Sequence, residues 1–91
     1  MLDHRLHKTT TVINKLGLHA RPAAMIANLA MNARSEIQLI KDGEPVDASS
    51  IIDILSLACV QGTKIALTAG HPDDACILDN IIQLFETGFG E

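Results

Sequence analysis

A histidine and an arginine stand two residues apart at the start of a helix-forming stretch. His19 and Arg21 belong to the run Gly17-Leu18-His19-Ala20-Arg21-Pro22. The first backbone N–H groups of a helix and the positive end of its dipole attract an anion, phosphate above all. The guanidinium of Arg21 adds a fixed charge whose planar fork matches phosphate oxygens. A ring nitrogen of His19 beside such a helix end could therefore accept a phosphoryl group and hold it as a phosphohistidine.

The residues themselves leave two interpretations of this histidine open. His19 could be a phosphoryl acceptor, or it could be an ordinary surface or capping histidine. Gly17 permits a tight turn ahead of the helix, which suits both interpretations. Ser49 and Ser50 precede a second helix-forming stretch and offer it an N-cap.

Seven elements are predicted to position these side chains. The predicted strands cover 7–14, 36–41, 44–48 and 64–69, and the predicted helices cover 20–34, 51–59 and 73–87. Asp42-Gly43 is a hairpin turn signal, and Pro45 places the strand that follows it at an edge of the sheet. The order β-α-β-β-α-β-α predicts an α+β open-faced β-sandwich, with a four-stranded antiparallel sheet and three helices on one face. We expect one domain over residues 1–91.

Helical periodicity predicts which faces of these helices are buried. On the first helix, Ala24 and Met25 lie at the border of a polar stripe and should be partly exposed. The residues of the second helix that should face the core are Ile51, Ile54 and Ala58. Ile52 stands at the border of that helix, where an apolar side chain can complete a core or form a docking patch. Asp73 and Asp74 should complement the dipole of the last helix.

Length and composition exclude several classes of function. At 91 residues the chain is too short for a dinucleotide-binding half or a TIM barrel. It has no Trp or Tyr and a net charge of −4, which disfavours nucleic-acid binding. There is no second acid or base group near His19 and no nucleotide-binding loop, so an enzyme in its own right is disfavoured.

The remaining reactive side chains predict a reducing compartment and no metal site. Cys59 and Cys76 lie among apolar residues without metal-like spacing, and we expect buried free thiols. His4 and His7 have no further ligand nearby and should be solvated. The N-terminus has no signal-peptide pattern, and no apolar run is long enough for a membrane span. We therefore expect a cytoplasmic protein that does not contact membranes.

The stretch around His19 resembles the signature of the HPr family, the histidine phosphocarriers of the bacterial phosphoenolpyruvate-dependent phosphotransferase system. A second family motif, Ser50-Ile51-Ile52-Asp53-Ile54-Leu55-Ser56-Leu57, lies at the matching distance. The resemblance covers Lys8 to Phe89. The run Asn14-Lys15-Leu16-Gly17 and the closing stretch 85–89 are more similar to the nitrogen-related branch of the family.

The resemblance implies a role for each matching residue. His19 would take a phosphoryl group on Nδ1 from enzyme I and pass it to an enzyme IIA domain, for sugar uptake, regulation or both. Arg21 would stabilise the phosphoryl group. Ser50 matches a serine that a dedicated kinase/phosphorylase modifies in some members. The implied protein is a monomeric, stoichiometric carrier that needs no cofactor and is not an enzyme.

The resemblance also implies a partner surface on the first two helices. Its candidate residues are Ala20, Ala24, Met25, Asn28, Ile51, Ile52 and Leu55. Sugar-transport members commonly carry a small polar residue where Leu16 stands here, so no side chain at that position can hydrogen-bond the His19 ring. The alternative function is a non-catalytic regulatory module controlled by phosphorylation at Ser50.

Overall fold

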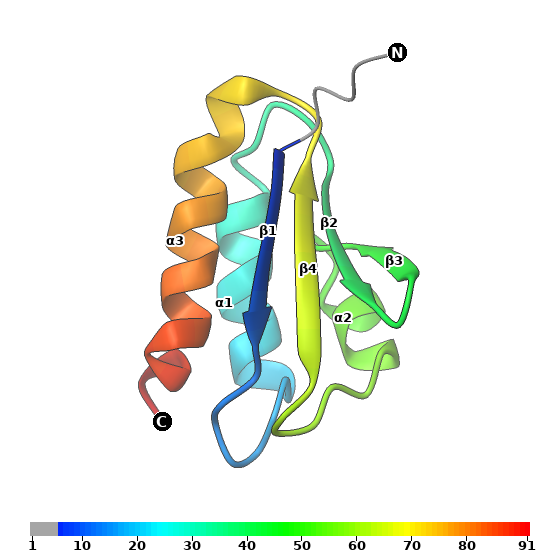
Figure 1. The fold of residues 1–91 in the computed structure, drawn as a ribbon, viewed down its shortest axis with the longest axis vertical. Helices are drawn as coiled ribbons and strands as arrows, with labels where there is room; N and C mark the ends of the chain where they lie inside the picture. Colours follow the sequence, from blue (N-terminus) through cyan, green and yellow to red (C-terminus); the bar gives the residue numbers. More distant parts are fainter. Residues whose placement is uncertain (1–5) are drawn as a thin grey trace.

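The computed structural model describes residues 6–91 and arranges them as a sheet with helices against one face (Figure 1). The strands are β1 (Leu6–Thr11), β2 (Ile37–Lys41), β3 (Glu44–Asp47) and β4 (Lys64–Ala69). The helices are α1 (Ala20–Ala30), α2 (Ile51–Ser56) and α3 (Ala75–Glu86), with short 3-10 segments η1 (Pro72–Asp74) and η2 (Gly88–Gly90). The predicted α+β open-faced sandwich and its element order are confirmed.

The four strands form one antiparallel sheet in the order β1-β4-β2-β3. The central strands are β4 and β2. Ala69 of β4 pairs with Leu6 of β1 on one side and with Ile37 of β2 on the other. Pro45 of β3 pairs with Ile40 of β2, and β3 is an edge strand, as predicted. This order places β1 at the opposite edge, beside α3 (Figure 1).

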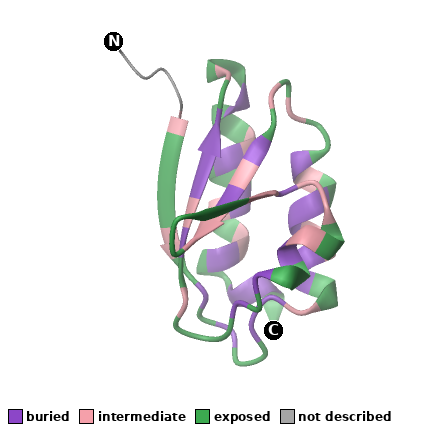
Figure 2. Ribbon diagram, turned by 90° about the vertical axis from the view of Figure 1, so that its right-hand side faces the viewer, coloured by how far each residue is buried: buried purple, intermediate pink, exposed green. Residues whose placement is uncertain are grey.

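The core lies between the sheet and the helices (Figure 2). In β4, Ile65, Leu67 and Ala69 are buried on the face toward the helices, as strand geometry requires, and Thr68 of the other face is buried as well. The helices contribute Ile26, Ile54, Leu78, Ile81 and Phe85 to the same cluster. The rings of Phe85 and Phe89 pack edge to face with centroids 5.0 Å apart. This contact fixes the segment after α3 against the core.

Most elements are shorter than predicted, and β1 and α1 end well before their predicted ends. Strand β1 ends at Thr11 because the chain turns back over 14–17, where Gly17 N–H donates to the Asn14 carbonyl. Helix α1 ends at Ala30, where the amides of Asn32 and Ala33 form turn hydrogen bonds in place of further α-helical bonds.

The predicted core face of α2 was partly wrong. The helix ends at Ser56, and Ala58 has a left-handed backbone (φ 52°) that cannot continue it. Ala58 is therefore exposed, and Leu57 is buried in its place. Ile54 is buried as predicted, but Ile51 is 40% exposed.

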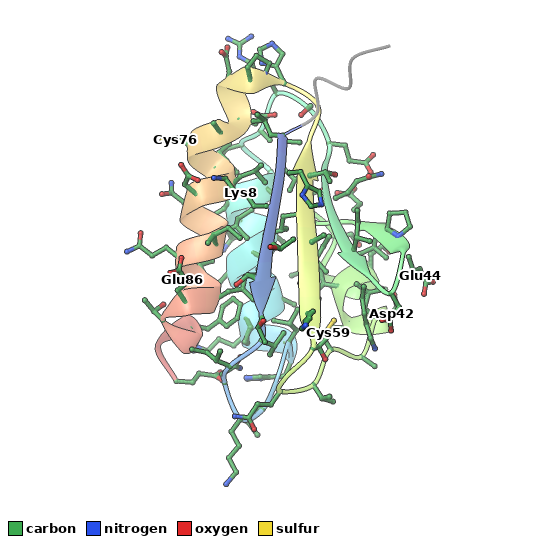
Figure 3. The ribbon with its side chains drawn as sticks, viewed as in Figure 1. Lys8, Asp42, Glu44, Cys59, Cys76 and Glu86 are labelled. Carbon is green, nitrogen blue, oxygen red and sulfur yellow. The ribbon has the colours of Figure 1, made fainter. Side chains whose placement is uncertain are left out.

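The two cysteines have different environments (Figure 3). Both are free, as predicted, but only Cys59 is buried, and its burial raises the pKa of its thiol. Cys76 is exposed, contrary to the prediction, because α3 buries Leu78, Ile81 and Phe85 on its other side. Within residues 6–91 there is no metal-binding cluster; His7 is exposed, and His4 lies outside the described residues. Over the same range no helix is long and apolar enough to cross a membrane.

Candidate functional site

His19 is the N-cap residue of α1. Its backbone is extended (φ −78°, ψ −171°), and its carbonyl accepts the first helical hydrogen bond from the Ala23 amide at 3.0 Å. The side chain makes no capping hydrogen bond to the helix. Ala20 and Arg21 present the first backbone N–H groups, and Pro22 has none. The histidine therefore stands at the positive end of α1 with its ring turned to other partners.

Gly17 fixes the loop that delivers His19. It adopts a left-handed backbone (φ +69°), and a Cβ there would lie under 3 Å from the carbonyl oxygen of Cys59. The next amide, of Leu18, donates to that same carbonyl at 2.9 Å. The loop is therefore pinned to the segment that follows α2, which brings the start of α1 close to the second helix.

A carboxylate that the sequence analysis did not single out contacts the histidine ring. The Nε2 atom of His19 lies 2.5 Å from Oε2 of Glu91. Figure 1 shows why, because the C-terminal segment ends at the same end of the molecule as the loop before α1. A carboxylate can only accept hydrogen bonds, so Nε2 carries the hydrogen in this contact. In the neutral ring Nδ1 is then the nitrogen with a free lone pair.

Asn14 and Arg21 bind the same carboxylate. Asn14 Nδ2 donates to Oε1 of Glu91 at 2.9 Å, and Arg21 Nη1 lies 3.4 Å from Oε2. The hydrogen bond from Asn14 is the largest cause that holds the pKa of Glu91 below its ordinary value. The hydrogen bond and charge of His19 and the charge of Arg21 add to this effect, while burial opposes it. The carboxylate is therefore ionised at neutral pH.

The Arg21 side chain is hydrogen-bonded at one nitrogen and still largely exposed. Its Nη1 donates to the carbonyl of Phe89 at 3.0 Å, while its side chain is 57% exposed. The guanidinium thus stays next to His19 but remains accessible to an anion at the start of α1. The site accordingly combines a nucleophilic ring nitrogen, a helix N-terminus and a fixed positive charge, which together can bind and transfer a phosphoryl group.

Ser50 is the N-cap of α2. Its Oγ accepts a hydrogen bond from the Asp53 amide at 3.2 Å. The capping interaction expected of a serine at this position is therefore present. The other end of α2 is held by Lys41, whose Nζ donates to the Leu57 carbonyl at 2.8 Å. This cation at the helix C-terminus, which the sequence analysis did not predict, fixes α2 against the sheet.

All seven candidate partner residues are at least partly accessible on α1 and α2, which pack against each other. On α1, Ala20 and Asn28 are exposed, and Ala24 and Met25 are half-buried, as predicted. On α2, Ile52 is 78% exposed, and Ile51 and Leu55 are each 40% exposed. We call these seven residues, Ala20, Ala24, Met25, Asn28, Ile51, Ile52 and Leu55, the docking surface.

Two further apolar side chains are exposed near the site, and the sequence did not predict their exposure. Leu16 is 70% exposed and Val60 is 67% exposed. They belong to the two loops that the bond between Leu18 and Cys59 joins. Leu16 stands three residues before His19 and Val60 directly follows Cys59, so both exposed side chains lie in the loops next to the start of α1.

A family model described as "PTS HPr component phosphorylation site" matches residues 6–87. The chain belongs to the HPr family. It is 40% identical over 86 residues to the phosphocarrier protein HPr of Cupriavidus necator, a match that covers 94% of this chain and 97% of the relative. It is also 38% identical to the phosphocarrier protein NPr of Klebsiella oxytoca, with 92% and 94% covered.

Solved HPr structures have the same fold. The crystal structure of HPr from Thermoanaerobacter tengcongensis matches with a TM-score of 0.88 at 38% identity, covering 94% of this chain and 97% of that one. The general role of the chain is therefore that of a phosphocarrier of the phosphotransferase system. Relatives named HPr and NPr match at similar identity, so the nitrogen-related branch stays a prediction.

Within this HPr-family site, Asn14 and Glu91 are the residues that the sequence analysis missed. They stand 77 positions apart, and only the fold brings them together. The signal available in the sequence was indirect: Leu16 cannot hydrogen-bond the ring, so another residue has to orient it. In the structure Glu91 makes that contact.

Proposed function

We propose that His19 accepts a phosphoryl group on Nδ1 from phosphorylated enzyme I and passes it to an enzyme IIA domain. The observation that carries this proposal is the contact between His19 Nε2 and Glu91, which leaves Nδ1 as the nucleophilic nitrogen at the start of α1. The family match supports the phosphocarrier role, and the site supports this histidine as the carrier residue.

The transfer step is a displacement at phosphorus. The Nδ1 lone pair forms a bond to phosphorus while the bond between phosphorus and the donor nitrogen of enzyme I breaks, and the electron pair of that bond stays on the donor. The His19 ring gains positive character as the new bond forms. The Glu91 carboxylate at Nε2 offsets that charge and keeps the shared hydrogen in place. Transfer to enzyme IIA is the same step with His19 as the donor.

Arg21 stabilises the phosphoryl group in this proposal. In the structure its Nη1 is held by Phe89 and Glu91, both at the end of the chain that lies beside the ring. A phosphoryl group on His19 carries more negative charge than the Glu91 carboxylate, and the exposed guanidinium can turn toward it.

The docking surface supplies the partner contacts. Its apolar side chains on α2 belong to a helix that packs against α1, and the loop before His19 is bonded to the segment after α2, so a partner that covers them would also lie near His19. A small interface of this kind suits a carrier that exchanges partners quickly, because affinity is adjusted mainly through the dissociation rate. Partner active sites supply the remaining catalytic groups.

Ser50 is the proposed regulatory site. Its hydroxyl caps α2 directly before Ile51 and Ile52 of the docking surface. A phosphate on Ser50 would place a dianion at the start of α2, where the helix tolerates it, and would repel acidic partner surfaces. The kinase that would act on it is a prediction from the family resemblance.

Phosphorylation by enzyme I tests the proposal. Incubation of the chain with enzyme I and phosphoenolpyruvate should give an acid-labile, alkali-stable species about 80 Da heavier. His19→Ala should abolish it, and His71→Ala, which changes a half-buried histidine that caps η1, should leave it intact. Absence of the adduct on the unmodified chain would overturn the proposal.

A further inference from the structure

Asn14 is a buried amide beneath the site. It is 5% exposed, and its Nδ2 donates to the carbonyl of Gly17 at 2.8 Å and to Oε1 of Glu91 at 2.9 Å. The first contact holds the loop that delivers His19, and the second holds the carboxylate that contacts the His19 ring. A single side chain therefore connects the two structures that determine where the ring lies.

The direction of the Asn14 amide follows from its neighbours. Both groups that meet Nδ2 are acceptors, so the reverse orientation would set an amide oxygen against two other oxygens. In the observed orientation Oδ1 is buried and has no hydrogen-bond partner among residues 6–91. An unpaired buried acceptor is unfavourable. Any stabilisation of the site by Asn14 therefore comes from the two hydrogen bonds that its Nδ2 donates.

Asn14 affects the His19 ring indirectly, through Glu91, and we call this pair of contacts, Asn14–Glu91 and Glu91–His19, the relay. Because Oε1 of Glu91 accepts from Asn14, the carboxylate is held with Oε2 toward His19. The Asn14 bond is also the main cause of the lowered pKa of Glu91, so it favours the ionised form that can only accept. An acceptor at Nε2 stabilises the ring with hydrogen on Nε2 and with Nδ1 open.

We propose that Asn14 is a positioning residue that acts through Glu91 to select the His19 tautomer with a free Nδ1. The inference rests on the proposed function, because a free Nδ1 matters only if that atom carries the phosphoryl group. It also accounts for Leu16, since the ring is oriented from the Nε2 side by a buried amide and a carboxylate.

A variant of Glu91 tests the relay without any partner protein. In Glu91→Gln the introduced amide has one oxygen and one NH2 group. Asn14 Nδ2 lies 2.9 Å from one carboxylate oxygen of Glu91 and Arg21 Nη1 lies 3.4 Å from the other, so the shorter contact favours the amide oxygen on the Asn14 side, while Nη1 keeps its bond to the Phe89 carbonyl. The NH2 group then faces His19 Nε2, which must accept, so hydrogen moves to Nδ1. The ¹⁵N shifts of the ring nitrogens, measured where the ring is neutral, should show a clear gain of the Nδ1–H tautomer. An unchanged tautomer ratio would overturn the proposal.

Reversing the donor at position 14 should reverse this effect. In Asn14→Asp combined with Glu91→Gln, the introduced carboxylate attracts the NH2 group, and the amide oxygen turns back to His19. The tautomer ratio should return toward that of the unmodified chain. A double variant that keeps the ratio of Glu91→Gln would contradict a role for Asn14. Glu86→Gln, at an exposed position of α3, is the matched control and should change nothing.

Folding does not limit the test. If circular dichroism shows that the Asn14→Asp variant is unfolded, Asn14→Ala combined with Glu91→Gln replaces it, because it frees the introduced amide to turn and should lower the Nδ1–H fraction relative to Glu91→Gln alone. An unchanged fraction would again count against Asn14. The tautomer ratio needs no phosphorylation, so its outcome is independent of the enzyme I experiment.

Discussion

The Nε2 atom of His19 lies 2.5 Å from the Oε2 atom of Glu91, a residue 72 positions away in the sequence. In this contact Nε2 is hydrogen-bonded, and in the neutral ring Nδ1 keeps a free lone pair. His19 is the N-cap of α1 and the exposed Arg21 lies two residues further on, so the ring proposed to take the phosphoryl group stands beside two sources of positive charge.

Removal of the Arg21 guanidinium should slow phosphoryl transfer. Hydrogen bonds to charged groups contribute about 1.5–3 kcal/mol, so Arg21→Ala should reduce the single-turnover rate with phosphorylated enzyme I by about tenfold to a hundredfold. Arg21→Lys should lie in between, because it keeps the charge and loses the fork. Arg34→Ala, another exposed arginine, serves as the control. An Arg21→Ala rate equal to that of the unmodified chain would refute this role.

Truncation of Ile52 should weaken docking without affecting folding. The side chain is 78% exposed, so Ile52→Ser should leave the free energy of unfolding nearly unchanged. If a partner buries it, the lost contact is worth about 1.5–3 kcal/mol, and the Kd for enzyme I measured by calorimetry should rise about tenfold or more. Met31→Ser changes an equally apolar exposed residue outside the docking surface and should not raise Kd. Equal effects of the two substitutions would argue against the assigned surface.

Substitutions at Ser50 should separate its capping role from its regulatory one. Ser50→Ala removes the acceptor of the Asp53 amide and should lower the free energy of unfolding in urea by about 1 kcal/mol. Ser50→Asp retains a capping acceptor and should keep the stability, yet its charge should slow transfer to an acidic partner. Transfer rates that follow stability across the two variants would show that Ser50 acts only as a cap.

Asp74 should make the fold sensitive to acid. Its carboxylate is buried and accepts from the amides of Arg34 and Ser35 at 2.8 and 2.9 Å and from the Ser35 hydroxyl at 2.6 Å. The hydroxyl bond is the first cause of a pKa below the ordinary value, and burial opposes it. Because the folded pKa is lower than the unfolded one, this stabilisation is complete above the unfolded pKa of about 3.9. It is lost as the pH falls through the folded pKa.

The Asp74→Asn variant checks this expectation. It should be less stable than the unmodified chain at neutral pH, because the introduced amide presents a donor to groups that are themselves donors. It should also lose less stability than the unmodified chain when urea denaturation is repeated below pH 4. Parallel stability curves for the two proteins over that range would contradict the linkage.

Local patterns in the sequence predict which helices and strands form, but not where each of them ends. The alternation of Ile65, Leu67 and Ala69 predicts β4 because strand geometry alone determines which side chains share a face. The end of α2 depends instead on tertiary contacts, the positive φ of Ala58 and the bond from Lys41 to the Leu57 carbonyl. No local pattern encodes these contacts.

The candidate site also combines residues that lie close together in the sequence with residues that only the fold brings together. His19, Arg21 and the start of α1 are adjacent in sequence, so their proximity was predictable. Glu91 reaches the His19 ring and Asn14 only because η2 folds back after α3 and Phe89 packs against Phe85. Asp74 was expected to complement the dipole of α3, but its side chain binds the loop at Arg34 and Ser35 instead.

The central claim is that Nδ1 of His19 carries the phosphoryl group, and NMR of the phosphorylated chain tests it most directly. With ¹⁵N-labelled histidine and phosphoenolpyruvate as donor through enzyme I, we predict phosphorus coupling to Nδ1 of His19, with Nε2 still bearing its hydrogen. Phosphorus on Nε2, or on a residue other than His19, would contradict the account.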